Sequence, residues 1–187
     1  MKKVIGIFGE KGSGKETFTQ LLKELLPGKK VQGVRTSEIL KQTLLFWNLP
    51  DVRENYSMLV TNMERVFGPG TLAKANSKLI DNSDADIIVV DGIRRQPEVD
   101  LVKSFPGSIL IYLTTNSQVR FERIKARGER ENERSMTHEE FIEEESLPTE
   151  QYFDQMKEMA DLTLENSEDL EEFRQTIHEF VLKYLSA

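Results

Sequence analysis

A chain of 187 residues, 38% of them hydrophobic, is long enough for one globular core and too short for two full domains. Its net charge of −7 argues against a general nucleic-acid binder, and the absence of cysteine excludes disulfides, thiolate metal sites and a cysteine nucleophile. No apolar run approaches the length of a membrane span and no secretory leader is visible, so we expect a cytoplasmic protein, monomeric or homodimeric, without nucleic-acid or membrane partners.

The first predicted elements are a short buried strand, Val4–Phe8, and a helix that begins at about Gly14. Between them, Gly9 to Lys15 follow the pattern Gly-x-x-x-x-Gly-Lys of a phosphate-binding loop. Glycines let such a loop curl until several N–H groups point at one anion, and the Lys15 ammonium can reach the β- and γ-phosphates of a nucleotide. The alternative is a glycine-rich turn that binds nothing, but the flanking strand and helix favour the phosphate site.

The residues after Lys15 depart from the usual pattern, in which a Ser or Thr hydroxyl directly follows the lysine and binds Mg²⁺. Here Glu16 follows, and a hydroxyl comes one residue later, at Thr17. Two arrangements stay open: Thr17 turns its hydroxyl to the metal, or Glu16 holds Mg²⁺ through water. The departure concerns the metal and leaves the predicted phosphate site intact.

Further strands are predicted at Val31–Val34, Ile87–Asp91, Ser108–Leu113 and Asp161–Leu164, the first and last of these being the weaker ones. Amphipathic helices are expected between the strands, and the final helix runs from about residue 167 to residue 185, with Asn166 as a candidate N-cap. This alternation of strand and helix favours an α/β fold with a parallel sheet.

Two long stretches interrupt the alternation, and in a compact domain such insertions are usually lids or binding pieces. We therefore divide a single domain of residues 1–187 into a core (1–36, 84–127 and 159–187), a helical acceptor-binding insertion (37–83) and a lid with the helices that follow it (128–158). A phosphoryl-transfer enzyme needs both insertions, because one holds the acceptor and the other keeps water from the phosphates.

A carboxylate and two arginines follow the third predicted strand. Asp91 could hold Mg²⁺ directly or through water, or orient an attacking hydroxyl; the alternative is a turn or N-cap aspartate. Because arginine forks match phosphate oxygens, we assign Arg94 to the phosphate of the acceptor and Arg95 to the surface, with the reverse order open. Ser37 and Lys41 follow the second strand and could line the acceptor pocket, although Ser37 could equally cap a helix.

Arginines at positions 120, 123, 127, 130 and 134 are spaced by three and four residues, which places those before Gly128 on one helical face. Interleaved glutamates could pair with them as an ordinary solvated surface. We expect Arg123 and Arg127 nearest the phosphate loop, and Arg130 and Arg134 as lid cations that close on the transferring phosphoryl group.

These segments together resemble the nucleoside monophosphate kinase branch of the P-loop kinases, and within it the adenylate kinase-related and dephospho-CoA kinase-like group. The matching segments are Gly9–Lys15, Thr36–Lys41, Asp91–Arg94, Arg120–Arg123 with Arg127–Arg130, and Ala160–Asp161 before Asn166. The resemblance implies a three-layer α/β/α fold with a five-stranded parallel sheet, a helical acceptor-binding insertion, a lid, and ATP with Mg²⁺ as phosphoryl donor.

By position, the resemblance also implies roles for single residues. Lys15 would stabilise the transferring phosphoryl group, Arg127 and Arg130 would act from the lid, Arg94 would contact the acceptor, and the turn near Asn166 would lie by the adenine. An acidic residue and then a threonine after the lysine is similar to what deoxynucleoside monophosphate kinases show.

We therefore predict an ATP-dependent phosphotransferase that moves the γ-phosphoryl group of ATP to a small phosphorylated acceptor, in the first instance a (deoxy)nucleoside monophosphate. The alternatives are a dephospho-CoA kinase-like activity, a nucleotide-dependent ATPase or switch that acts through a partner, and a nucleotide-binding scaffold. The predicted catalytic residues are Lys15, Asp91, Arg127 and Arg130, and the predicted acceptor-binding residues are Ser37, Lys41 and Arg94. The predicted ATP-binding residues are Gly9, Glu10, Lys11, Gly12, Ser13, Gly14, Lys15, Glu16, Thr17, Arg123 and Asn166, with Thr17 and Asp91 as Mg²⁺ ligands, partly through water.

Overall fold

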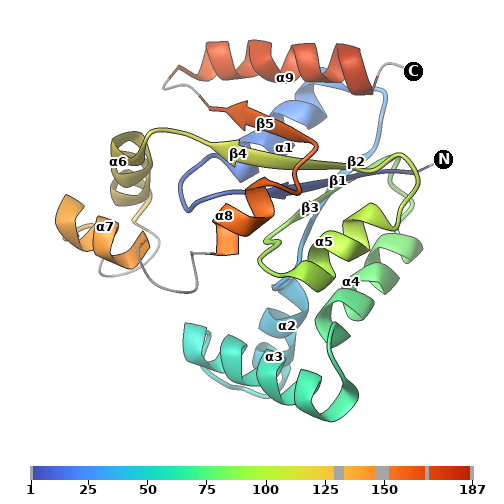
Figure 1. Cartoon of the computed structure of the whole chain (residues 1–187), viewed down its shortest axis with the longest axis vertical. Helices are drawn as coiled ribbons and strands as arrows, with labels where there is room; N and C mark the ends of the chain where they lie inside the picture. Colours follow the sequence, from blue (N-terminus) through green and yellow to red (C-terminus); the bar gives the residue numbers. More distant parts are fainter. Residues whose placement is uncertain (1, 129–132, 146–151, 167–168, 186–187) are drawn as a thin grey trace. The chain divides into compact units, whose positions relative to one another are not determined.

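In the computed structural model, which describes residues 2–128, 133–145, 152–166 and 169–185, five strands form one parallel sheet with flanking helices (Figure 1). The strand order is β2-β3-β1-β4-β5. The strands are β1 (Lys3–Phe8), β2 (Val31–Arg35), β3 (Ile87–Asp91), β4 (Ile109–Thr114) and β5 (Leu162–Glu165). Each end lies within one residue of the range predicted from the apolar runs, and the predicted α/β fold class is confirmed.

The chain divides into two compact units, and the division passes through β1. The first unit consists of Met1–Gly6 and Lys29–Ile109, and the second consists of Ile7–Gly28 and Leu110–Ala187. The predicted phosphate loop belongs to the second unit, and the predicted acceptor-binding residues belong to the first. The division into core, insertion and lid stays a prediction, and parts of the predicted lid, residues 129–132 and 146–151, lie outside the described residues.

In the first unit, β2 pairs with β3 in parallel, with Val31 opposite Ile87 and Arg35 opposite Asp91. The first four residues of β3 are buried, as the continuous apolar run of this strand predicts. Because the two strands end level with each other, the segments that follow them meet at one edge. There the backbone N–H of Thr36 donates to the carbonyl oxygen of Asp91 at 2.8 Å.

The helices of the first unit are α2 (Glu38–Phe46), α3 (Arg53–Phe67), α4 (Thr71–Asn82) and α5 (Gln96–Lys103). Helix α4 buries Leu72, Ala73 and Ile80 and packs against β2 and α5. In contrast, α3 has no buried residue and lies against α2 and α4 (Figure 1). The stretch that the sequence predicts to be mostly helical therefore holds three helices, of which the middle one is the most exposed.

In the second unit, β4 pairs with β5 in parallel, with Ile111 opposite Leu162. The helices of this unit are α1 (Lys15–Leu25), α6 (Ser117–Arg127), α7 (His138–Glu145), α8 (Tyr152–Lys157) and α9 (Leu170–Tyr184). Helices α1 and α9 pack together, with the rings of Phe18 and Phe180 5.8 Å apart (Figure 1). Of the helices formed by described residues, none is both long enough and apolar enough to cross a membrane.

The beginning of the last helix differs from the prediction. Helix α9 begins at Leu170, and the carboxylate of Asp169 caps it by accepting from the backbone N–H groups of Glu171 at 2.6 Å and Glu172 at 3.3 Å. Asn166 is not the cap, because its backbone N–H donates to Thr114 O at 2.8 Å and continues the pairing of β5 with β4. This leaves the side chain of Asn166 available for contacts outside the helix.

Candidate functional site

The predicted phosphate loop is a tight turn between β1 and α1. Gly9 has a φ of 152° and Gly14 a φ of 96°, in the region that favours glycine. A Cβ on Gly9 would overlap the carbonyl oxygen of Leu113 in β4, and a Cβ on Gly14 would overlap Nδ2 of Asn166. Because no side chain fits at either position, the loop presents bare backbone, which is what a phosphate cradle needs.

The ammonium group of Lys15 lies over this loop. Lys15 is the first residue of α1, and its Nζ donates to Gly9 O and Glu10 O at 3.0 Å each and lies 3.4 Å from Ser13 Oγ. Charged phosphate oxygens are stronger acceptors for an ammonium group than neutral carbonyl oxygens. The predicted role of Lys15 would be to exchange these carbonyls for the phosphates of a nucleotide, and this role stays a prediction.

Two of the candidate metal ligands, Glu16 and Thr17, lie on the first turn of α1, and the third, Asp91, ends β3. Glu16 is exposed, whereas Thr17 is half-buried. Hydroxyl and carboxylate oxygens are ligands that suit Mg²⁺, and the metal would come with phosphates that supply further oxygens. Either residue could serve, and their metal role stays a prediction.

The side chain of Glu10 is anchored by two residues that the sequence did not indicate. The hydroxyl of Tyr112 in β4 donates to Glu10 Oε1, and Lys157 Nζ of α8 lies 3.8 Å from the same oxygen and 5.1 Å from the centre of the Tyr112 ring. Burial and, next, the hydrogen bond to Glu10 raise the pKa of the Tyr112 hydroxyl. The carboxylate that the loop carries is thus tied to a strand and a helix of the same unit.

We expect Tyr112→Phe to lower the free energy of unfolding by about 1.5–3 kcal/mol, because it removes a buried hydrogen bond to a charged acceptor. The pKa of the Tyr112 hydroxyl is raised in the folded protein. The hydrogen bond therefore contributes fully to the free energy of unfolding below the pKa of the unfolded chain, which is about 10. This contribution is lost as the pH rises through the pKa of the folded protein. Urea unfolding at pH 7 and above pH 10 measures both effects. Tyr184→Phe on α9 is the control, and equal losses in the two variants at pH 7 would contradict the expectation.

The arginines that the sequence places on one helical face lie in different environments. Arg120 is buried, donates through Nε to Thr115 O at 3.1 Å and through Nη1 to Glu145, and lies 5.7 Å from the centre of the Phe141 ring. Its burial lowers the pKa of the guanidinium. Arg120 therefore holds α6 to α7.

The arginines that are predicted to act on the phosphates differ in burial and in contacts where the structure describes them. Arg123 is half-buried and donates through Nη2 to Asn166 Oδ1 at 3.4 Å, so it lies beside a residue that contacts the loop. Arg127 is exposed at the end of α6. Arg130 lies outside the described residues, and the catalytic roles of Arg127 and Arg130 stay predictions.

An ion pair joins the loop to the segment that precedes α7. Lys11 Nζ lies 2.7 Å from an oxygen of Glu133, whose side chain is only 1% exposed. The sequence left open that Glu133 and its neighbouring glutamates pair with arginines on a solvated surface. In the structure the Glu133 side chain is buried and pairs with a cation of the predicted phosphate loop. Through Glu10 and Lys11, the loop is linked to two segments of the predicted lid region.

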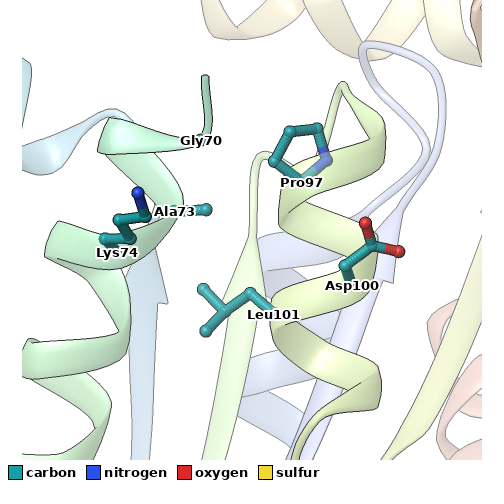
Figure 2. A pocket seen from close by; sticks show the side chains of 6 residues that line it. All are labelled: Gly70, Ala73, Lys74, Pro97, Asp100 and Leu101. Carbon is teal, nitrogen blue, oxygen red and sulfur yellow. The ribbon is translucent and has the colours of Figure 1, made fainter. Parts of the chain in front are cut away.

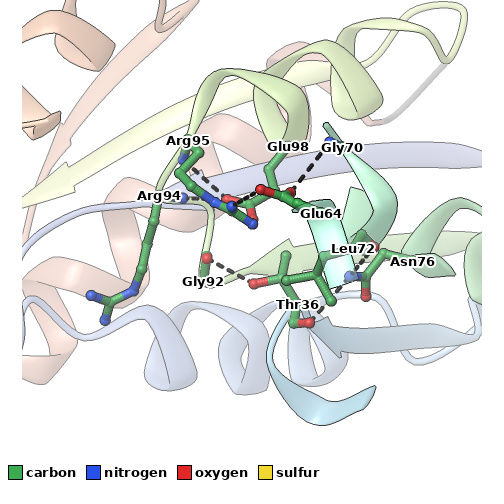
Figure 3. Close-up of polar contacts among 9 residues, drawn as sticks. All are labelled: Thr36, Glu64, Gly70, Leu72, Asn76, Gly92, Arg94, Arg95 and Glu98. Carbon is green, nitrogen blue, oxygen red and sulfur yellow. Dashed lines mark hydrogen bonds and ion pairs between the residues drawn. The ribbon is translucent and has the colours of Figure 1, made fainter. Parts of the chain in front are cut away.

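A second cluster of polar contacts lies in the first unit, where β2 and β3 end (Figure 3). Thr36 is buried; its Oγ1 donates to Gly92 O at 2.7 Å, and its carbonyl oxygen accepts from Asn76 Nδ2 at 3.1 Å. Asp91 Oδ1 accepts from the backbone N–H of the next residue, Gly92, at 2.6 Å. The carboxylate has further lone pairs, so this contact leaves room for the predicted metal or hydroxyl role of Asp91, which stays a prediction.

The two arginines after β3 have different surroundings (Figure 3). Arg95 is half-buried; its Nη1 donates to Glu64 Oε2 at 2.8 Å and its Nη2 to Glu98 Oε1 at 3.3 Å. Arg94 is exposed, and its side chain points away from this cluster. Arg95 thus joins α3 to α5, and Arg94 is the more accessible guanidinium for a ligand.

We expect Glu98→Ala to lower the free energy of unfolding by about 3 kcal/mol. Glu98 is 2% exposed, and its Oε2 accepts from the backbone N–H groups of Arg94 at 2.7 Å and Arg95 at 3.0 Å. Its loss would leave these two backbone donors without their acceptor and would remove one of the two carboxylates that pair with the Arg95 guanidinium. Chemical denaturation measures the change, and the substitution Glu139→Ala at an exposed position is the control. A loss of under about 1 kcal/mol for Glu98→Ala would contradict a stabilising role of the Glu98 contacts.

The remaining predicted acceptor-binding residues lie at the start of α2. Ser37 occupies the N-cap position, but its side chain makes no cap hydrogen bond among the described residues, so the capping alternative gains no support. Lys41 Nζ lies 3.9 Å from Asp51 Oδ2, and both side chains are about half exposed. A surface ion pair of this kind is weak, and an anionic ligand could replace Asp51.

A shallow pocket of about 240 Å³ opens between α4 and α5 (Figure 2). Its lining residues are Gly70, Ala73, Lys74, Pro97, Asp100 and Leu101. The volume is below the roughly 300–1,000 Å³ of typical small-molecule sites, and none of the predicted site residues lines it. We therefore do not assign the pocket to the candidate site.

A phosphate loop between the first strand and the first helix of a five-stranded parallel sheet defines a P-loop kinase-like fold. The chain belongs to the AAA domain family (AAA_18), whose model matches residues 5–148.

One curated relative and two solved structures are similar to this chain over nearly its whole length. A UPF0200 protein of Methanosarcina mazei is 25% identical over 189 residues, covering 100% of this chain and 98% of the relative. The shikimate kinase of Acinetobacter baumannii in complex with shikimate superposes with a TM-score of 0.56 at 16% identity, covering 100% of this chain and 96% of that one. A gluconokinase of Sinorhizobium meliloti 1021 gives a TM-score of 0.53 at 14% identity, with coverages of 97% and 92%. At these identities the two kinase structures are similar to this chain in fold.

Proposed function

We propose that this chain is an ATP-dependent phosphotransferase that moves the γ-phosphoryl group of ATP to a (deoxy)nucleoside monophosphate. The observation that carries the proposal is the loop before α1, where glycines at positive φ leave no room for side chains and the Lys15 ammonium lies over the loop carbonyls. Such a loop suits a polyphosphate, because backbone N–H groups, a helix N-terminus and a lysine act on the same anion.

Phosphoryl transfer asks little covalent chemistry of a protein. Catalysis comes from holding donor and acceptor in line and from placing cations where negative charge spreads in the transition state. In this proposal Lys15 acts on the β- and γ-phosphates, Arg123, Arg127 and Arg130 add positive charge, and bound Mg²⁺ neutralises phosphate oxygens. Thr17 or Glu16 would hold the metal from α1.

The acceptor is assigned to the edge where β2 and β3 end. Exposed Arg94 and half-exposed Lys41 are cations that suit the phosphate of a monophosphate, and Ser37 lies at the start of the same helix as Lys41. This arrangement supports a phosphorylated acceptor over a neutral one, since two cations at one edge favour an anion.

Transfer to a hydroxyl group, as in a dephospho-CoA kinase-like activity, is the second candidate. Asp91 ends β3 and is a carboxylate that could orient an attacking hydroxyl. The two solved structures with this fold are a shikimate kinase, in complex with shikimate, and a gluconokinase, and shikimate carries hydroxyl groups. This candidate therefore belongs in the same assay.

The test is ADP release from ATP and Mg²⁺ in the presence of single acceptors: nucleoside and deoxynucleoside monophosphates, dephospho-CoA, shikimate and gluconate. The proposal expects release that depends on a monophosphate, with the corresponding diphosphate as second product. Release that depends only on a hydroxyl acceptor would favour the second candidate. Release without any acceptor would show an ATPase, and no release with any acceptor would overturn both.

A further inference from the structure

The side chain of Asn166 is buried against the phosphate loop, with 3% of its surface exposed. Its Nδ2 donates to Ser13 O at 2.8 Å, and its Oδ1 accepts from Arg123 Nη2 at 3.4 Å. Its backbone N–H donates to Thr114 O at 2.8 Å, which fixes the end of β5 on β4. The residue that the resemblance placed beside the adenine thus contacts the loop itself.

These contacts determine which way the amide of Asn166 points. With Nδ2 toward the Ser13 carbonyl and Oδ1 toward the Arg123 guanidinium, a donor meets an acceptor on both sides. The reverse orientation would set two carbonyl oxygens against each other and an NH₂ group against a cation. Arg123 therefore orients the amide, and the amide in turn holds the loop.

The hydrogen bond fixes one peptide unit of the loop. In a trans peptide the C=O and the following N–H point in opposite directions. When Asn166 holds the carbonyl of Ser13 toward itself, the N–H of Gly14 points away from Asn166. From this geometry we propose that Asn166 is a positioning residue that aims the Gly14 N–H at a bound phosphate group.

Gly14 shows how little room this arrangement leaves. A Cβ at Gly14 would overlap Nδ2 of Asn166, so the amide lies directly against the backbone that it orients. Aspartate at position 166 has the same shape but presents an oxygen to the Ser13 carbonyl, and alanine presents nothing. The role therefore depends on the donor and not on the volume of the side chain.

The inference rests on the proposed nucleotide binding, and the test uses the full chain with two probes, ADP and inorganic pyrophosphate. Asn166→Asp and Asn166→Ala are compared with Asn62→Asp, which makes the same charge change at an exposed position of α3. We expect both Asn166 variants to bind each probe about tenfold or more weakly, because a hydrogen bond that orients a phosphate donor is lost. Asn62→Asp should bind as the wild type does, and KM for ATP should rise more than kcat falls.

The chemical shift of the Gly14 amide proton separates a loss of N–H orientation from a general loosening of the loop. The amide proton of Gly14 should shift downfield when pyrophosphate binds to the wild type and to Asn62→Asp, and the shift should be lost in Asn166→Ala. Thermal melts show which variants are folded, and only these are compared. If the buried charge of Asn166→Asp prevents folding, Asn166→Ala alone carries the test. Unchanged affinity together with an unchanged Gly14 shift would overturn the inference.

The outcomes also separate this inference from the proposed function. If the wild type binds pyrophosphate and depends on Asn166 for it but transfers no phosphoryl group, the inference holds and the proposed function fails. If transfer is found and the Asn166 variants bind as tightly as the wild type, only the inference fails. A wild type that binds neither probe overturns both.

Discussion

Replacing Lys15 by alanine should lower turnover by about 10²–10³-fold or more, the loss expected when one preorganised charge-stabilising donor is removed. The ammonium of Lys15 already lies at the loop, 3.0 Å from two of its carbonyl oxygens. No other described side chain of the loop can supply that charge, since Lys11 is engaged with buried Glu133. A coupled assay of ADP formation with the best acceptor measures the effect.

The control for this variant lies on the same helix. Lys23 is exposed in the last turn of α1, so Lys23→Ala removes the same charge and leaves the loop unchanged. We expect its turnover to stay within about twofold of the wild type, in line with small effects of surface substitutions. Equal losses in the two variants would mean that the net charge, and not the position of Lys15, matters.

Gly9→Ala should cause the second largest loss, and it should affect folding and binding together. A Cβ at this position would overlap the carbonyl oxygen of Leu113, and the φ of 152° is strained for any residue with a side chain. We expect a loss of about 2–4 kcal/mol in the free energy of unfolding, from strain and displacement of the loop. ADP affinity should fall by at least about tenfold, because the displaced loop no longer presents its N–H groups together.

Gly28→Ala is the matched substitution, because a Cβ at Gly28 would meet no atom within 4 Å. Its free energy of unfolding should change little or rise by about 0.4–1 kcal/mol, as alanine restricts the unfolded chain. Urea unfolding and fluorescent ADP titration on both variants provide the comparison. A Gly9→Ala protein as stable and as tightly binding as Gly28→Ala would show that the loop tolerates a side chain there.

The strands and the phosphate loop could be predicted from the sequence because their signals are local. An apolar run such as Ile87–Val90 specifies a buried strand, and the spacing from Gly9 to Lys15 specifies a loop before a helix. The match of the strand ends to within one residue reflects the polar residues that border these runs. The five-stranded parallel sheet followed from the alternation of elements and from the family resemblance.

The partners of the loop could not be predicted, because they come from distant parts of the chain. Tyr112 and Lys157 meet Glu10, and Glu133 meets Lys11, across separations that no spacing rule covers. In the sequence, Tyr112 is only one residue of a predicted strand, and Glu133 is one of several glutamates that could form a solvated surface. Only the pairing of β4 with β5 and the packing of the later helices bring them to the loop.

Asn166 illustrates the same limit at one position. An asparagine before a run of acidic residues is a reasonable N-cap on local grounds, but Asp169 lies nearer to the start of α9 and takes that role. What decides the position of Asn166 is the strand that precedes it, which ends beside Ser13. A tertiary contact therefore overrode a local preference.

We predict that the loop between β1 and α1 binds the phosphates of a nucleotide with the help of Lys15. Isothermal titration of ATP with Mg²⁺ into the wild type and into Lys15→Ala tests it most directly. We predict one saturable site per chain in the wild type and an affinity at least about tenfold lower in the variant, the effect of removing a charge-assisted contact. No saturable heat with the wild type, or equal affinities in the two proteins, would contradict the claim.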